Sequence, residues 1–324
     1  MTSYRDAGVD IEGADQHVAS IAGDVTRTWT GQVTGEFGGF AAGVEIPDDF
    51  QQPVLMMSTD GVGTKLELAR RSGAWSGVGQ DLVAMCVDDL AAVGAAPIGF
   101  VDYLAVGSLH PDRDRQIIAS VASGCASAGC PLLGGETAEH PGVMASDAVD
   151  LAGTAMGVVE KGTLLGPHRV GVDDVIVGLH SPGVRSNGFS LIRAVMADSV
   201  DDHIDDLLEP SVIYSPAVLA AVGTGALKAA AHITGGGIVA NLSRVVPDDL
   251  GARIDTTVWS PPEIFDIIAS FGVGQDEMFR TFNMGLGFCL IVDADGVDAV
   301  SAIVDDHRPV VLGTISANGG VVLS

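Results

Sequence analysis

Residues 60–65 read Asp-Gly-Val-Gly-Thr-Lys and directly follow an apolar run at residues 53–59. Glycine lets backbone N–H groups approach phosphate oxygens, an aspartate can offer oxygen to Mg²⁺, and a lysine adds a compact positive charge. The chain contains only three lysines, at positions 65, 161 and 228, and one of them closes this segment. The segment therefore predicts a site for a metal-bound polyphosphate, formed by Asp60, Gly61, Gly63, Thr64 and Lys65.

The same six residues also allow a plainer interpretation. They do not match the usual P-loop, which needs Gly-x-x-x-x-Gly-Lys-[Ser/Thr]. Asp-Gly is a strong turn signal, so an ordinary turn at the exit of a strand is the alternative that spacing alone leaves open.

A second acid-and-glycine segment follows at residues 130–139, which read Cys-Pro-Leu-Leu-Gly-Gly-Glu-Thr-Ala-Glu. This pattern predicts a short strand that ends at Gly134 and Gly135, with Glu136 and Thr137 in the loop after it. Loops at strand ends are where α/β proteins place ligands. We therefore expect the two acid-and-glycine segments to face one common site.

The helix predicted at residues 81–93 carries two adjacent aspartates. Its apolar stripe follows Leu82, Cys86, Leu90 and Val93. At about 100° per residue, Asp88 is expected opposite this stripe in solvent, and Asp89 at its flank. A carboxylate at the edge of a buried face needs a metal ion or hydrogen-bond donors to offset its desolvation, unless it rotates out to water.

Strands and helices alternate along the chain. We expect strands at residues 54–58, 98–106, 151–159, 175–179, 288–292 and 310–315, with helices between them that include residues 14–22 and 112–129. This order predicts an α/β (α+β) fold. Residues 160–169 resemble a linker, which divides the chain into domains at 1–165 and 166–324. Glycine turns recur in the second domain at residues 186–190, 232–237 and 283–287.

Composition limits the class of protein. The net charge is −26 and the pI is near 4.3, which argues against nucleic acid or an anionic membrane as a partner. An anionic substrate would need a local metal, placed cations or a salty cytoplasm. No apolar run is long enough to span a bilayer and the first residues lack a signal-peptide pattern, so we expect a soluble cytoplasmic protein. The four cysteines lack metal-site spacing and are expected to be buried free thiols.

Seven segments, taken in order, resemble the phosphoribosylformylglycinamidine cyclo-ligases, also called aminoimidazole ribonucleotide synthetases. These segments are residues 3–11, 60–65, 81–87, 134–139, 186–191, 232–237 and 277–285. The Asp-Gly-Val-Gly-Thr-Lys segment is also similar to that of relatives such as thiamine-monophosphate kinases, selenophosphate synthetases and hydrogenase-maturation proteins. The opening segment and the Asn-Met-Gly at 283–285 favour the purine enzyme.

The resemblance implies a function and a fold. Formylglycinamidine ribonucleotide and ATP would give aminoimidazole ribonucleotide, ADP and phosphate, with Mg²⁺ as the metal. It also implies two α/β domains and a homodimer, in which the N-terminal domains bind ATP and form the dimer sheet or barrel.

The resemblance also implies roles for individual residues. Asp60 and Asp89 would hold Mg²⁺. The phosphates and the rest of the nucleotide would be bound by Gly61, Gly63, Thr64, Lys65, Gly134, Gly135, Glu136 and Thr137. Ser186, Asn187 and Gly188 would contact the substrate, and Lys65, Arg185 and Asn187 would take part in catalysis.

Three departures from the family pattern leave alternatives open. Arg185 stands where the family has a histidine, and arginine can bind a phosphate but cannot shuttle a proton near neutrality. Asp88 replaces an asparagine and is interpreted as a surface acid, and Glu36 adds an acid to the glycine-rich segment at 34–40. The alternatives are another kinase or synthetase of the same superfamily, such as one like thiamine-monophosphate kinase, and a catalytically silent nucleotide-binding subunit.

Overall fold

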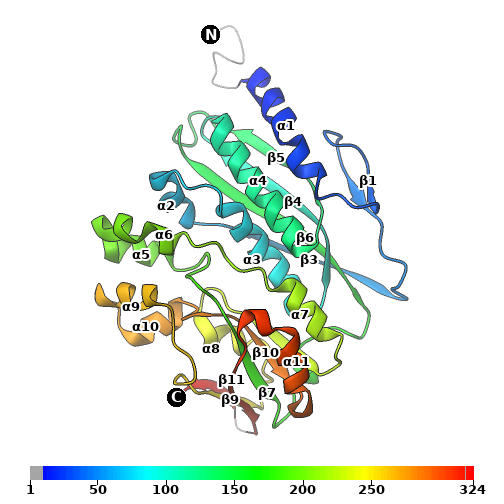
Figure 1. The fold of residues 1–324 in the computed structure, drawn as a ribbon, viewed down its shortest axis with the longest axis vertical. Coiled ribbons are helices and arrows are strands. Elements are labelled where there is room, and N and C mark those ends of the chain that lie inside the picture. The colour runs from blue at the N-terminus through cyan, green and yellow to red at the C-terminus, as the bar shows by residue number, and fades with distance from the viewer. Residues whose placement is uncertain (1–9, 318) are drawn as a thin grey trace. The chain divides into compact units, whose positions relative to one another are not determined.

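The computed structural model describes residues 10–317 and 319–324 (Figure 1). The chain forms two compact units, an N-terminal one with Pro97–Glu160 and the chain up to Leu90, and a C-terminal one with Ala91–Ala96 and Lys161–Ser324. The predicted two-domain α/β class is confirmed. The first unit ends at Glu160, a few residues before the domain boundary that was expected between residues 165 and 166. The sequence pattern did not indicate that Ala91–Ala96 belongs to the second unit. Residues 3–9 of the family-like opening lie outside the described residues.

The N-terminal unit is built on a four-stranded sheet in the order β3-β6-β4-β5. Its strands are β3 (Pro53–Gly61), β4 (Ala96–Val106), β5 (Leu132–Glu139) and β6 (Val149–Glu160). A short ribbon pairs β1 (Val33–Thr34) with β2 (Gly43–Val44). The helices of this part of the chain are α1 (Ile11–Thr26), α2 (Lys65–Ser72), α3 (Val78–Ala92) and α4 (Pro111–Ala128).

The chain order explains how the sheet is connected. β4 and β5 run parallel, so the chain must cross over between them, and helix α4 makes that crossover. The helix ends at Gly129, which adopts φ 67°, a left-handed conformation that glycine reaches without steric cost. β3 and β6 pair antiparallel along their whole length, with Asp60 opposite Gly153.

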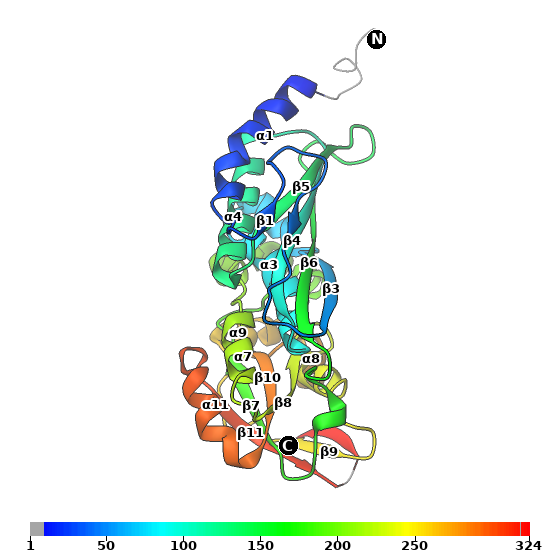
Figure 2. The same cartoon turned by 90° about the vertical axis from the view of Figure 1, so that its right-hand side faces the viewer.

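Helices α1, α3 and α4 lie on one face of this sheet (Figure 2). A Cβ atom built on Gly79 of α3 would lie 2.1 Å from the backbone nitrogen of Val121, so glycine is what lets α3 approach α4. The opposite face of the sheet keeps apolar side chains in solvent, since Leu55, Met57, Val101 and Tyr103 are all exposed.

The predicted orientation of Asp88 was wrong. Its side chain is completely buried, whereas Asp89 is exposed. Every residue from Asp81 to Asp88 is buried because α3 is enclosed on almost all sides and has no solvent face opposite its apolar stripe. A helix stripe predicts a solvent face only where the helix lies at the surface.

The C-terminal unit is built on a six-stranded sheet in the order β12-β9-β11-β7-β10-β8. The strands are β7 (Val175–His180), β8 (Leu227–His232), β9 (Gly251–Ile254), β10 (Leu286–Val292), β11 (Val310–Ser316) and β12 (Gly320–Leu323). The helices are α5 (Phe189–Met196), α6 (Ile204–Leu207), α7 (Ser215–Val222), α8 (Gly237–Leu242), α9 (Glu263–Ser270), α10 (Gln275–Thr281) and α11 (Val297–Ile303). β10 is buried along its full length and separates two apolar cores.

The six strands predicted from the sequence are all present, each slightly longer than expected. One local prediction was wrong. Gly134, Gly135, Glu136 and Thr137 lie within β5 and not in a loop after it, because their backbone continues the parallel ladder with β4, in which Glu136 pairs with Tyr103. Pairing with a neighbouring strand outweighs the low strand propensity of glycine. No helix of the described residues is long and apolar enough to cross a membrane.

Candidate functional site

Asp60 and Asp89 lie on the same side of the N-terminal sheet. Successive strand residues alternate between faces, so Asp60 shares a face with Ser58, and the Ser58 hydroxyl donates to Asp89 Oδ2 at 3.3 Å. Both aspartates also act on the thiol of Cys86. Burial first, then the carboxylate of Asp60 and to a smaller extent that of Asp89, raise the pKa of Cys86. The structure therefore places both carboxylates near the thiol of Cys86.

These residues fit a magnesium ion that is bound along with a ligand. Both carboxylates are exposed, and Mg²⁺ is usually held by one or two carboxylates together with substrate phosphates and water. Among the described residues, no group of three or more His, Cys, Asp or Glu side chains is arranged to hold a metal ion by itself. The site is thus suited to a metal that arrives with phosphates.

The segment after β3 leads into helix α2. Gly63 adopts φ 70°, is exposed, and has open space where a Cβ would lie. Thr64 is the N-cap residue of the eight-residue helix and is also exposed. The first turn of α2 therefore follows Asp60 by a few residues, and its backbone N–H groups form the end of the helix that favours anions.

Lys65 is placed differently from its neighbours. Its ammonium group is completely buried and lies 2.7 Å from Oδ2 of Asp81, which is also completely buried. The ion pair fastens the first turn of α2 to α3. In this conformation the lysine charge does not face solvent, so its contact with phosphates stays a prediction.

Gly134, Gly135, Glu136 and Thr137 line a cavity of about 600 Å³ in the same unit. The glycine-rich segment from Glu36 to Ala42 and side chains of α1 form its other walls. β5 and β3 occupy opposite edges of the sheet, three strand spacings or about 14 Å apart. Within one chain, the two acid-and-glycine segments therefore do not lie side by side as expected.

The predicted substrate residues of the C-terminal unit lie between β7 and α5. Asn187 Oδ1 would be 3.4 Å from a Cβ on Gly235, so it faces the glycine turn at 234–237. Gly188 has φ 80°, and a Cβ there would lie 2.2 Å from the ring of Phe282. Asn283 continues the contact, because its Nδ2 donates to the carbonyl of Gly183 at 3.0 Å. All three glycine turns of this unit meet here.

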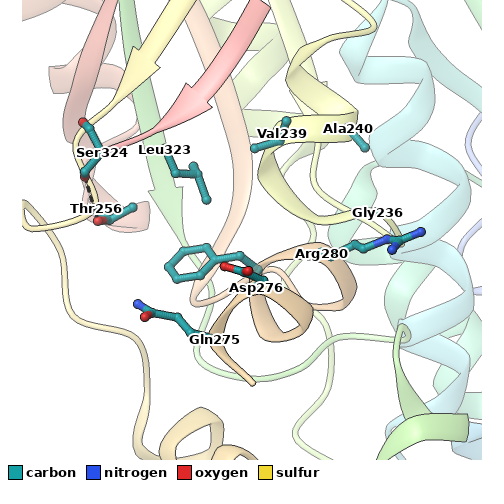
Figure 3. A pocket seen from close by; sticks show the side chains of 10 residues that line it. Gly236, Val239, Ala240, Thr256, Gln275, Asp276, Arg280, Leu323 and Ser324 are labelled. Atoms are coloured by element: carbon teal, nitrogen blue, oxygen red, sulfur yellow. Dashed lines mark hydrogen bonds between the residues drawn. The ribbon is translucent and has the colours of Figure 1, made fainter. Parts of the chain in front are cut away.

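A cavity of about 470 Å³ lies next to the same glycine turn (Figure 3). Gly236 forms part of its wall, and Gln275, Asp276 and Arg280 extend toward it from α10. Arg280 and Glu277 form no ion pair among the described residues. The carboxylate of Glu277 instead accepts from the hydroxyl of Thr281 at 2.9 Å.

Arg185 is buried, with 1% of its side chain exposed, and its backbone adopts φ 65°. Its Nη2 donates to Nε2 of His232 at 2.8 Å, and its Nη1 donates to the carbonyl of Val212 at 2.8 Å. The guanidinium also lies over the ring of Tyr214, 5.1 Å from its centre. Since arginine can only donate, His232 carries no proton on Nε2 in this arrangement. Arg185 therefore positions His232 and does not itself reach solvent.

Among the buried carboxylates that sequence reasoning missed, two bear on the candidate site. Asp81 was assigned no role, yet it neutralises Lys65. Asp102 of β4 was not singled out at all, although it lines the cavity at β5 and burial raises its pKa to about 7. A charged residue inside the apolar run at 98–106 was the signal available for Asp102. The expectation for the cysteines is confirmed, as all four are free and buried.

The fold is shared with solved structures of a thiamine-monophosphate kinase and of hydrogenase maturation proteins. The structure of thiamine-monophosphate kinase from Stenotrophomonas maltophilia K279a superposes with a TM-score of 0.68 at 19% identity, covering 98% of this chain and 97% of that one. The hydrogenase maturation protein HypE in complex with ATP superposes with a TM-score of 0.72 at 17% identity, covering 98% and 93%. Identities this low define the fold alone.

Sequence comparison defines the family. The AIR synthase related protein family matches with its N-terminal domain at residues 41–159 and its C-terminal domain at residues 171–324. The chain belongs to this family. A phosphoribosylformylglycinamidine cyclo-ligase from Neisseria meningitidis serogroup B is 44% identical over 331 residues, which cover 98% of this chain and 96% of that protein.

Proposed function

We propose that this protein is an ATP-dependent ligase of purine biosynthesis that converts formylglycinamidine ribonucleotide to aminoimidazole ribonucleotide, with release of ADP and phosphate. The similarity over nearly the full chain to a protein of that name supports the assignment. The observation that carries it is the placement of Asp60 and Asp89 near the thiol of Cys86, with the exposed start of α2 a few residues after Asp60. These groups match a metal-bound triphosphate.

The reaction needs a leaving group that the substrate lacks. The formamide oxygen takes the γ-phosphoryl group of ATP and releases ADP, which makes it a phosphate ester of an imidate. An amidine nitrogen of the same molecule then attacks that carbon, the carbon–oxygen bond breaks, and phosphate leaves with the bonding electrons. The protein must hold both ends of one substrate together and stabilise charge at the phosphoryl group.

Residues of the N-terminal unit serve the phosphoryl transfer. Asp60 and Asp89 would hold Mg²⁺, and a bound Mg²⁺ neutralises charge on the phosphate oxygens. The backbone N–H groups of Gly63 and Thr64 would donate to the same oxygens, whereas those of Gly61 and Val62 already donate to Oδ1 of Asp60 and to the carbonyl of Leu151. Lys65 supports the segment through its pair with Asp81 and keeps α2 in place.

Residues of the C-terminal unit serve the ring closure. Ser186, Asn187 and Gly188 bind the substrate in this proposal. The position of Asn187 supports it, because its side chain faces the glycine turn at Gly235. Arg185 acts on these three residues indirectly, because its hydrogen bond fixes His232 at the start of the glycine turn at 232–237. This arrangement gives Arg185 a positioning role that needs no proton transfer, so its replacement of the family's histidine is compatible with activity.

The cyclisation assay tests the function directly. The protein is incubated with Mg·ATP and formylglycinamidine ribonucleotide, and the ring product, ADP and phosphate are expected in equal amounts. Thiamine monophosphate serves as the competing acceptor. Turnover with thiamine monophosphate and no ring product would replace the proposal with a kinase. ATP binding without turnover on either acceptor would favour a silent subunit, above all if Arg185→His restored activity.

We also propose a homodimer formed through the uncovered face of the N-terminal sheet. Met57 is 71% exposed and Leu55 is 50% exposed on this face, and an apolar sheet face needs a cover. A second copy of the chain can provide this cover, because a twofold interface places the same face of both protomers against each other. Such an interface would bring the β3 edge of one protomer toward the β5 edge of the other. Light scattering after gel filtration should give twice the chain mass, and Met57→Asp should give monomers. A monomeric parent protein would contradict this.

The charge of −26 supports a cytoplasmic enzyme that works at high salt. Carboxylates repel one another over a Debye length of about 10 Å at 0.1 M salt and about 3 Å at 1 M. Salt therefore relieves repulsion within the chain and between the chain and its anionic substrates.

A further inference from the structure

The segment that leads into β10 contains a strained turn. The N–H of Leu286 donates to the carbonyl of Asn283 at 3.0 Å, and the two residues between them, Met284 and Gly285, adopt φ 49° and φ 83°. Positive φ at both central residues is typical of a type I′ turn, which favours asparagine, aspartate or glycine. Methionine in this conformation costs energy, so the surrounding structure must hold it there.

Two buried side chains hold this turn. Oδ1 of Asn283 accepts from the backbone N–H of Gly285 at 2.8 Å, and Nε1 of Trp259 donates to the carbonyl of Met284 at 2.9 Å. Asn283 is 3% exposed and Trp259 is 6% exposed. The turn is therefore fixed by groups that are largely shielded from solvent.

The same turn is bonded to the segment that follows β7. Nδ2 of Asn283 donates to the carbonyl of Gly183 at 3.0 Å, and the hydroxyl of Ser181 donates to the same carbonyl at 3.0 Å. The backbone N–H of Ser181 donates to the carbonyl of Gly285 at 2.8 Å. One carboxamide thus serves both segments, because its oxygen binds the turn and its nitrogen binds the segment at 181–183.

The chain after Gly183 carries the residues proposed to bind the substrate. Arg185 follows two residues later and adopts φ 65°, a second strained conformation. Gly188 lies against the ring of Phe282, since a Cβ at position 188 would be 2.2 Å from that ring. Residues 183–188 are therefore held at one end by Asn283 and at the other by the residue before it.

We propose that Asn283 is a positioning residue for the ring closure. Its carboxamide holds residues 183–188 in the conformation in which Ser186, Asn187 and Gly188 contact formylglycinamidine ribonucleotide, while Asn283 itself is buried away from the substrate. A closure between two ends of one molecule depends on orientation, so a loosened segment should lower the rate as well as the affinity. The proposal rests on the function proposed above.

Asparagine is the residue type that this role requires. Its carboxamide offers an acceptor and a donor at the same distance from the backbone. An ionised aspartate would keep the acceptor for Gly285, lose the donor for Gly183 and place a negative charge against that carbonyl oxygen. A protonated aspartate would regain a donor, and burial raises the pKa of an aspartate. Asn283→Asp should therefore recover function as the pH falls.

Three variants separate positioning from a general loss of stability. Asn283→Asp removes the donor, and Asn283→Ala removes both hydrogen bonds. Val300→Ala is the matched control, because Val300 is a completely buried residue of α11. Its truncation destabilises the core of the same unit without removing a hydrogen bond of either segment.

The measurement is kcat and the KM for each substrate in the cyclisation assay at pH 6 and pH 8, with the thermal unfolding temperature of each variant as the folding control. At pH 8, Asn283→Asp should lower kcat/KM for formylglycinamidine ribonucleotide at least about tenfold, because a misplacement of about 1 Å can cost about a hundredfold in rate. The KM for ATP should stay close to that of the parent, since ATP is proposed to bind in the N-terminal unit.

Other titratable and charged groups lie near the two segments. His180 and His232 lie on the strands that flank the start of β10, and the side chain of Glu209 lies against Gly183. Arg185 keeps its charge throughout this pH range. These groups are common to variant and parent, so the ratio of kcat/KM between the two isolates position 283. This ratio should be higher at pH 6 than at pH 8 for the aspartate variant and equal at both for the alanine variant.

The outcomes separate this proposal from the function itself. A parent that makes no ring product overturns the proposed function. An active parent whose folded Asn283 variants keep the kinetic constants of Val300→Ala overturns the positioning role alone, and so does a KM for ATP that rises as much as the KM for the other substrate. If Asn283→Ala does not fold, Asn283→Asp decides, because a ratio to the parent that is the same at pH 6 and pH 8 would exclude a role for the donor to Gly183.

Discussion

Two groups of carboxylates in the N-terminal unit are suited to opposite tasks. Near the β3 edge, Asp60 and Asp89 are exposed and both lie near the thiol of Cys86. At the β5 edge, Asp102 is buried behind apolar walls and burial raises its pKa to about 7. Exposed carboxylates are well hydrated and can share a metal ion, whereas burial favours the neutral form of a carboxyl group, which can donate a hydrogen bond. Solvent access, more than residue type, sets what each aspartate can do.

Lys65 shows a third way to handle charge in the same unit. It is as deeply buried as any residue there, yet it retains an ionic partner in Asp81. A buried charged side chain with an ionic partner stabilises the fold. A buried carboxyl group without such a partner has a raised pKa, and an exposed carboxylate can bind a metal ion. The following predictions test this distinction.

The largest effect is expected from Lys65→Met. Removing one member of a buried ion pair leaves the other charge without compensation, at a typical cost of about 3–5 kcal/mol of unfolding free energy. Urea denaturation of the variant and its parent measures the difference. The double variant Lys65→Met, Asp81→Leu should recover most of the loss, and a single variant as stable as the parent would contradict the role of the pair.

A pH-dependent effect is expected from Asp102→Asn. The folded-state pKa of Asp102 is raised above the value of 3.8 for an unperturbed aspartate, so the folded chain binds one more proton than the unfolded chain between about pH 4 and pH 7. The parent therefore loses stability as the pH rises through this window, by up to about 4 kcal/mol, and the asparagine variant does not. Unfolding free energies of both proteins at pH 4, 5.5, 7 and 8 test this. A difference between them that is constant with pH would show that Asp102 titrates normally.

A smaller effect is expected from Asp60→Asn. The amide is a weaker metal ligand than the carboxylate, so kcat at saturating Mg·ATP should fall at least about tenfold. Stability should barely change, because Asp60 is exposed. Asp298→Asn, which removes an exposed carboxylate of α11, is the control for charge, and an unchanged kcat in Asp60→Asn would count against a metal at this edge.

The smallest effect, counted per exposed carboxylate, is expected from a change in salt concentration. Repulsion among exposed carboxylates is screened as KCl rises, so activity and unfolding temperature should increase between about 50 mM and 1 M. The comparison of the parent at both concentrations is sufficient. Full activity at the lower concentration would remove the argument for adaptation to salt.

Much of the fold could be predicted from the sequence. Apolar runs identified six strands, and the helical spacing at residues 112–129 identified α4 to within a residue. Strands β1, β2, β8, β9 and β12 were not predicted, and all of them except β8 have at most four residues, which carry too little periodicity. The membership of Ala91–Ala96 in the second unit depends on packing that no local pattern encodes.

The site was predictable in part. The resemblance implied that Asp60 and Asp89 share a metal, and the structure places both near the thiol of Cys86, while their binding of a metal stays a prediction. The burial of Asp88 could not be predicted from its own helix, because it depends on how completely neighbouring elements enclose α3. The hydrogen bond between Arg185 and His232 joins residues that are 47 positions apart in the sequence, so local spacing could not predict it.

By itself, the sequence determined the residue types that can do chemistry, the strands and helices that carry them, and the charge of the whole chain. Only the tertiary structure decided which carboxylates are in water and which are enclosed, which cation is neutralised, and which edges of the sheet the two acid-and-glycine segments occupy. The reason is that periodicity and propensity act between near neighbours, whereas burial and pairing depend on residues that the fold brings together from distant parts of the chain.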